Sequence, residues 1–182
     1  MTRSSVEPPI PPAPPARSLT PRPLTAAAFA AFGEVLEASG DFRLINAGLC
    51  RRHHDRATLD FGAGTVPPGR AGISVFAAEP RRLPYRFDLI ERHPDGSQAF
   101  LPMTQHPFLV IVATGPGARP QAFLTSGAQG INLHRGVWHG VLTPLHAPGL
   151  FAVVDRIGTT ANLEEYRYDA EWTVLDPAAG PG

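Results

Sequence analysis

The stretch "YRFDLIERHPDGSQAFLPM" (residues 85–103) contains two strand-like segments around a polar turn. Residues 85–93 and 98–103 are rich in aromatic and branched apolar side chains, and Pro94–Ser97 supplies turn-forming residues between them. Successive side chains of a strand alternate between its two faces. One face of the first segment therefore carries Tyr85, Phe87, Leu89, Glu91 and His93. Because that face begins strongly apolar, we expect it to point into a β-barrel.

The opposite face of the same segment carries Arg86, Asp88, Ile90 and Arg92. After the turn, Gln98 and Phe100 can return to the inward face. Three polar side chains, Glu91, His93 and Gln98, would then meet at one rim of the barrel. A buried carboxylate is costly unless a cation, a donor or water lies beside it, so this rim is a candidate functional site.

Strand-like segments with the same character continue along most of the chain. They cover residues 42–48, 72–78, 107–114, 121–126, 138–145, 150–157 and 171–175. Many short strands at spacings of about 8–15 residues, separated by Gly and Pro turns, indicate an all-β sandwich, jelly roll or closed barrel. Residues 24–37 predict one short N-terminal helix, with Thr25 as its cap and Gly33 at its end. No strand–helix alternation supports a doubly wound α/β fold.

The length of 182 residues favours a single domain with tails. Proline lacks a backbone donor and fixes φ, so the proline-rich residues 1–23 are expected to form a disordered tail. Residues 177–182 are expected to form a flexible C-terminal tail. The domain itself is expected to span residues 24–176.

The charge balance excludes some classes of partner. There are 16 basic and 16 acidic residues, so a nucleic-acid or anionic-membrane surface is not expected. No apolar run reaches the roughly 18 residues of a membrane span, and no signal-peptide core follows the N-terminus. The single cysteine, Cys50, cannot form an intramolecular disulfide. A cytoplasmic location fits these features.

A second polar cluster lies in "SGAQGINLHRGVWHGVL" (residues 126–142). Its functional side chains are Gln129, Asn132, His134, Trp138 and His139. Imidazole is the commonest metal ligand in proteins and the natural acid or base near neutral pH. His93 and His139 with carboxylate or amide oxygens could therefore bind a divalent metal ion, or could transfer protons without one.

The segments "ERHPDGSQAFLPM", "FLTSGAQGINLHRGVWH", "FAVVDR" and "INAGLCRRHHD" resemble the ureidoglycolate lyase family. The resemblance covers residues 23–170 and implies a cupin-type jelly-roll β-barrel, a homodimer and a small-molecule substrate. It implies cleavage of (S)-ureidoglycolate to glyoxylate and urea, in allantoin and purine degradation. It implies no organic cofactor.

The resemblance also implies roles for particular residues. On the two cupin metal motifs, Glu91 and His93 fall at the histidine places, Gln98 at the glutamate place, and His139 at the second-motif histidine. Such a site would hold a divalent ion such as Ni, Zn, Mn or Fe. Glu91, His93 and His139 would be catalytic, and the residues expected to bind substrate are Arg52, Gln98, Asn132, His134 and Arg156.

Two other functions are compatible with the same residues. A non-catalytic cupin would bind a small carboxylate without turning it over. A related metal-dependent enzyme would act on another hydroxy or keto acid. Arg92 and Arg135 are further candidate guanidinium groups for a carboxylate, although strand alternation directs Arg92 away from Glu91.

Overall fold

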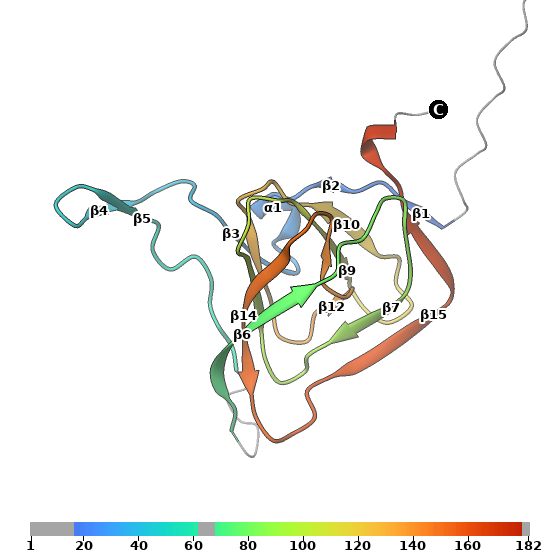
Figure 1. The fold of residues 1–182 in the computed structure, drawn as a ribbon. Helices are drawn as coiled ribbons and strands as arrows, with labels where there is room; N and C mark the ends of the chain where they lie inside the picture. Colours follow the sequence, from blue (N-terminus) through green and yellow to red (C-terminus); the bar gives the residue numbers. More distant parts are fainter. Residues whose placement is uncertain (1–16, 62–67, 180–182) are drawn as a thin grey trace, which may run out of the picture.

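The computed structural model describes residues 17–61 and 68–179, and shows a barrel of β-strands with one short helix (Figure 1). This architecture confirms the all-β, jelly-roll prediction. Residues 1–16 and 180–182, on which most of the two expected tails fall, lie outside the described residues. Within the described ranges, no helix is long and apolar enough to cross a membrane.

Two sheets form the barrel. The 8-stranded sheet has the order β1 (Ser18–Leu19), β15 (Glu164–Val174), β7 (Tyr85–Arg92), β12 (Trp138–His139), β9 (Phe108–Ala113), β10 (Gln121–Leu124) and β2 (Arg22–Pro23), with β13 (Thr143–Pro144) beside β9. The 5-stranded sheet has the order β3 (Gly33–Leu36), β11 (Gly130–Leu133), β8 (Gln98–Pro102), β14 (Gly149–Ile157) and β6 (Arg70–Ala78). The remaining elements are a hairpin of β4 (Arg43–Ile45) and β5 (Cys50–Arg52), helix α1 (Ala26–Phe29) and the 3-10 turn η1 (Pro177–Ala179).

Strand β9 explains why one segment of the sequence is apolar without alternation. Phe108, Val110 and Val112 belong to the main core, with residues of both sheets and of α1. Leu109, Ile111 and Ala113 belong to a second core, on the other side of the larger sheet. A strand buried on both faces reads as a continuous apolar run.

The predicted alternation of β7 side chains between the two faces of the sheet agrees with the structure only near Glu91, at the end of the strand. Phe87 and Ile90, expected on opposite faces, pack in the same second core. The pairing of β7 with the neighbouring strand β15 is irregular. Arg167 pairs with Leu89 and Trp172 pairs with Phe87, so β15 uses more residues than β7 over the same stretch. A bulge of this kind twists the strands locally, and period-2 alternation cannot reveal it.

The predicted helix is shorter than expected. Thr25 does cap it, accepting a hydrogen bond from the Ala28 backbone N–H at 3.2 Å. However, Gly33 begins β3, which pairs with β11, a strand that the sequence did not reveal. A Cβ atom at Gly33 would lie 1.9 Å from the carbonyl oxygen of Asn132. Glycine at this position therefore permits close strand contact and does not end a helix.

The N-terminal segment, residues 17–23, is part of the barrel although the sequence assigned it to a tail. β1 pairs in parallel with β15, and β2 pairs in parallel with β10. These partners lie near opposite ends of the same sheet, and only Thr20 and Pro21 separate the two short strands. We call residues 17–23 the strap, since they join the two ends of the curled sheet (Figure 1).

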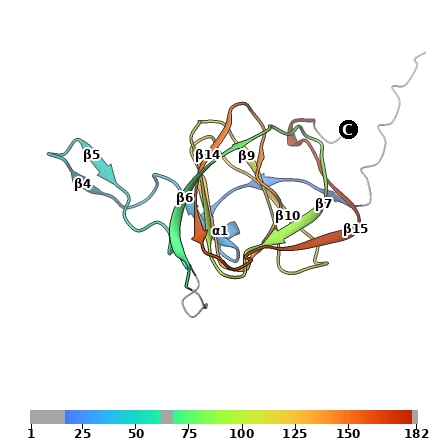
Figure 2. The same ribbon diagram turned by 60° about the horizontal axis from the view of Figure 1, so that its bottom comes forward.

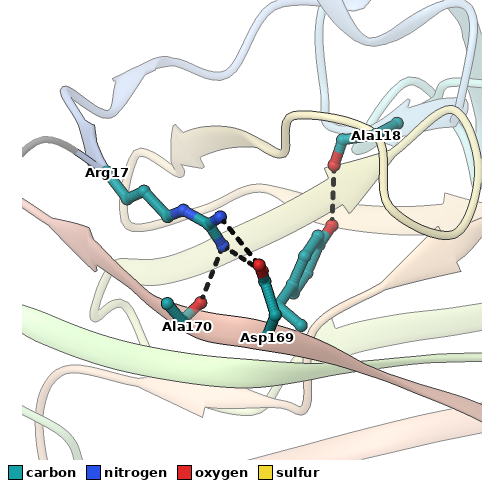
Figure 3. A network of polar contacts seen from close by, with 5 residues as sticks. Arg17, Ala118, Asp169 and Ala170 are labelled. Atoms are coloured by element: carbon teal, nitrogen blue, oxygen red, sulfur yellow. Dashed lines mark hydrogen bonds and ion pairs between the residues drawn. The ribbon is translucent and has the colours of Figure 1, made fainter.

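Side-chain contacts hold the strap against β15. The Arg17 guanidinium donates to the Asp169 carboxylate at 2.6 Å and to the Ala170 carbonyl at 3.3 Å (Figure 3). The hydrogen bond from Arg17 holds the pKa of the Asp169 carboxyl below its usual range. Close by, the Tyr168 hydroxyl donates to the carbonyl oxygen of Ala118 at 2.8 Å.

Tyr168 should make the fold sensitive to alkaline pH. Burial raises the pKa of Tyr168 to about 12, and Tyr166 adds to the shift. The unfolded chain loses this phenolic proton near pH 10, before the folded chain does, so folding stability falls as the pH rises from about 10 to about 12. Tyr168→Phe should therefore lose about 1 kcal/mol less stability between pH 9 and pH 11 than the natural chain. Guanidinium unfolding at both pH values measures this difference, and equal losses in both proteins would contradict it.

Candidate active site

Glu91, His93 and His139 come together at one end of the barrel. Their ligand atoms all lie within 4.8 Å of one another, which makes them a possible metal-binding group. Strands β7 and β12 create this arrangement, because His139 pairs directly with Glu91 across the antiparallel ladder. His93 follows β7 immediately, and the centres of the two imidazole rings are 5.4 Å apart.

Hydrogen bonds fix the orientation of both imidazole rings. The Nδ1 atom of His93 lies 2.6 Å from the carbonyl oxygen of Asn162, and that of His139 lies 3.0 Å from the carbonyl oxygen of Gly140. A carbonyl oxygen can only accept, so each Nδ1 carries a proton, and in the neutral ring each Nε2 presents a lone pair. Both Nε2 atoms are buried and, in the described part of the chain, have no hydrogen-bond partner. Imidazole ligands of metals are oriented in the same way, through the ring nitrogen that does not bind the metal.

Burial also sets the charge of this group. It lowers the pKa of His139 to about 4, so this imidazole is neutral at physiological pH. Burial raises the pKa of the Glu91 carboxyl; Glu165, which pairs with Glu91 across the sheet, adds to this effect, and His93 opposes it. Glu91 therefore holds a proton more readily than an exposed glutamate.

Gln98 and Asp155 provide the polar side chains of the facing sheet. The Gln98 amide nitrogen lies 3.5 Å from Asp155 Oδ2. The amide oxygen of Gln98 and the Oδ1 atom of Asp155 are buried and make no hydrogen bond with the residues that the structure describes. The turn Pro94–Ser97 joins His93 to Gln98, so these acceptors lie at the same end of the barrel as the histidines.

The sequence prediction included Gln98 but missed Asp155. The signal was present in β14, where Phe151 and Val153 belong to the main core and Asp155 continues their alternation.

The barrel interior behind His139 is filled. A cavity of about 20 Å³ remains there, among Phe100, Ile131, Leu133 and Leu142. This volume holds about one water molecule.

Asn132 and His134, which the sequence analysis expected to bind substrate, are not brought to this group. Their neighbours Ile131 and Leu133 point into the main core, so Asn132 points to the outer face of the smaller sheet. Its amide donates to Glu34 Oε2 at 2.8 Å and to the Thr58 carbonyl at 3.2 Å, and His134 Nε2 lies 2.8 Å from Glu34 Oε1. Both side chains therefore fasten β11 to β3 and to the segment that contains Thr58.

Arg156 also has a structural environment. Its side chain is 1% exposed and lies 4.0 Å from Asp95 Oδ2. A Cβ atom on Gly69, Gly96 or Gly158 would lie within 3 Å of this side chain. The side chain of Arg156 is therefore packed against the turn that contains Asp95 and Gly96.

The other candidate arginines are also separate from Glu91. Arg52 lies on β5, in the hairpin that stands away from the barrel (Figures 1 and 2). Arg92 points away from Glu91, as alternation predicted, forms an ion pair with Glu164 at 2.6 Å and lies 4.9 Å from the Trp138 ring centre.

A jelly-roll barrel with two imidazoles and a carboxylate at its open end defines the class of this protein, a cupin-type fold with a small-molecule active site. The family comparison narrows this class. Residues 16–175 match the family model described as ureidoglycolate lyase, and the chain belongs to that family.

Curated relatives agree over most of their length. A ureidoglycolate lyase of Rhodobacter capsulatus is 60% identical over 148 residues, covering 79% of this chain and 89% of the relative. A ureidoglycolate lyase of Mesorhizobium japonicum is 46% identical over 164 residues, covering 87% of this chain and 98% of the relative. One of Stutzerimonas stutzeri is also 46% identical, with 88% and 96% covered.

Proposed function

We propose that this chain is a lyase that cleaves (S)-ureidoglycolate to glyoxylate and urea. The observation that carries this proposal is the convergence of Glu91 with the two Nε2 lone pairs of His93 and His139. Family membership supplies the substrate, and the site supplies the groups that its chemistry needs.

The reaction moves one proton. A single carbon of ureidoglycolate carries a hydroxyl group, a ureido nitrogen and a carboxylate. The hydroxyl proton leaves as the carbonyl of glyoxylate forms, the C–N bond breaks, and the departing urea nitrogen gains a proton. Glu91 can accept the first proton and deliver it to the nitrogen, because both atoms sit on the same carbon. In the metal-free site, its raised pKa suits a group that must both take and return a proton.

We propose that Glu91, His93 and His139 hold a divalent metal ion. Two buried lone pairs and a carboxylate fit Zn, Ni, Mn or Fe, and the amide oxygen of Gln98 is a candidate fourth ligand. When bound, such an ion lowers the pKa of a coordinated hydroxyl group.

The two buried acceptors opposite the histidines suit the ureido group, which carries N–H donors. We assign Asp155 Oδ1 to these donors and keep Gln98 Oε1 as the candidate fourth metal ligand. Asp155→Ala should raise KM about tenfold, since a lost hydrogen bond to a charged group costs about 1.5 kcal/mol. Asp169→Ala, at the strap, is the matched control and should leave KM unchanged. Steady-state kinetics with both variants measures the effect, and equal KM values would remove Asp155 from substrate binding.

We further propose that the protein is a homodimer, located in the cytoplasm, with residues 24–176 and the strap forming one catalytic domain. Exposed apolar side chains on β6 support the dimer, with Ile73 at 78% and Val75 at 66% exposure. The free thiol of Cys50 is compatible with a reducing compartment.

A coupled urea assay on the purified protein tests the reaction. Protein is incubated with (S)-ureidoglycolate, urea and glyoxylate are both measured, and a sample without protein gives the background. A chelated sample and elemental analysis run in parallel to test the metal. We expect equimolar products and loss of turnover on chelation. Saturable binding without urea release would instead indicate a non-catalytic carboxylate-binding protein.

A further inference from the structure

The hairpin of β4 and β5, with its flanking residues 41–53, forms an arm that its own barrel does not support. Among the described strands, β4 and β5 pair only with each other, and both views show them standing away from the barrel (Figures 1 and 2). Leu49 is 91% exposed and Leu44 is 60% exposed. An isolated two-stranded hairpin is at best marginally stable in water. This arm therefore needs a surface that covers its apolar side chains.

The arm also concentrates positive charge. Arg43 pairs directly with Arg52 across the hairpin, so both guanidinium groups start from the same face. Like charges directly opposite each other are destabilising unless an anion lies between them. Neither arginine takes part in a salt bridge within residues 17–61 and 68–179.

The active site has the opposite charge. Glu91, Asp155 and Glu165 form no salt bridge with any described residue. A substrate carboxylate would be repelled by these groups, so a side-chain cation beside the proposed metal ion would favour its binding. All 16 basic residues of this chain are arginines, so a guanidinium group must supply the side-chain cation.

The arginines that contact the turns beside the site are already engaged. Arg92 pairs with Glu164 and Arg156 pairs with Asp95. The Arg135 guanidinium donates to the Pro94 carbonyl at 2.5 Å. The arm, by contrast, carries two guanidinium groups on one face without an acidic partner in the described chain.

The outer face of the smaller sheet offers a surface for an arm. Ile73 and Val75 on β6 are largely exposed, and Leu101 on β8 is 39% exposed. They share one face, because Val75 and Leu101 both pair with Ala152 of the intervening strand β14. β6 is also an edge strand, which presents unpaired backbone groups.

We propose that the arm belongs to the active site of a second copy of this chain. Its apolar residues cover the outer face of β6 in that copy, and Arg43 and Arg52 hold the carboxylate of the substrate there. In a two-fold dimer each copy gives one arm and receives one. This assignment rests on the proposed lyase function, whereas the docking of the arm does not.

Complementation between two defective variants tests the shared site. Arg52→Ala removes the guanidinium of the arm, and His139→Ala removes a histidine of the barrel. The two chains are co-expressed with different tags, and heterodimers are isolated by two successive affinity steps. If the sites are shared, one site of the heterodimer joins an intact barrel to an intact arm. The other site joins the His139→Ala barrel to the Arg52→Ala arm. The two homodimeric variants are the controls.

We expect each homodimer to lose at least 90% of the urea-release activity, and the heterodimer to recover about half of the natural activity per dimer. If the arm served its own barrel, both sites of the heterodimer would be defective and no recovery would occur. Absence of recovery therefore overturns the shared site.

The molar mass in solution tests the docking independently of activity. The natural chain should be a dimer by light scattering, and the double variant Leu44→Asp and Leu49→Asp should dissociate to folded monomers. A monomeric natural chain, or a double variant that remains dimeric, overturns the docking of the arm. If the natural dimer releases no urea, the lyase proposal fails while the molar-mass result still decides the docking.

Discussion

His139→Ala should lower the rate of urea release by about 10²–10⁴-fold and abolish stoichiometric metal binding. The imidazole is buried, neutral and held with its Nε2 lone pair facing the site, so alanine removes a ligand that no nearby group replaces. His93→Ala should have the same effect, since its ring has the same orientation. The coupled urea assay and elemental analysis measure the two losses, with circular dichroism to show that the fold is retained.

A second pair of histidines provides the control. The rings of His106 and His146 lie 5.1 Å apart, at exposed positions in turns. Alanine at either position should leave turnover and metal content unchanged. Near-natural turnover in folded His93→Ala or His139→Ala would remove that histidine from the mechanism.

Phe123→Ala should lower the free energy of unfolding by about 3–5 kcal/mol. The Phe123 ring is fully buried in the main core and packs edge-on against Phe29 of α1, with ring centres 5.6 Å apart. Arg22 of the strap lies over the same ring at 4.9 Å. One side chain thus joins the helix, the strap and β10, and alanine would leave a cavity between them.

Guanidinium unfolding at neutral pH measures this loss. Leu163→Ala is the control, because Leu163 is 51% exposed and its truncation creates no cavity. A loss below about 1 kcal/mol in Phe123→Ala would mean that the surrounding core collapses around the smaller side chain.

The sequence predicted the fold class because most strands carry a local signal. β8, β9 and β14 are apolar and bounded by turn residues, which is enough to identify them. β11 and β3 lack this signal. Each begins with a glycine, Gly130 or Gly33, that allows close approach to the backbone of a strand distant in sequence. The register irregularity between β15 and β7 is also a property of the paired strands and carries no signal in either sequence segment alone.

The site was predictable to the extent that it follows local alternation. Glu91, His93 and Gln98 were found in this way, and His139 through its glycine-rich neighbourhood. Asn132, His134 and Arg156 lie apart from this group, because polar side chains can equally serve structural contacts elsewhere in a barrel. Their partners, Glu34 and Asp95, are distant in sequence, so only the folded chain reveals them.

The strap also protects the chain against aggregation. With β1 and β2 in place, β15 and β10 are both paired strands, and the larger sheet presents only two-residue segments at its ends. A chain shortened to begin at Leu24 would expose the backbone donors and acceptors of both longer strands. Open strand edges are templates for intermolecular pairing, so such a chain would be prone to ordered aggregation even while its active site stayed intact.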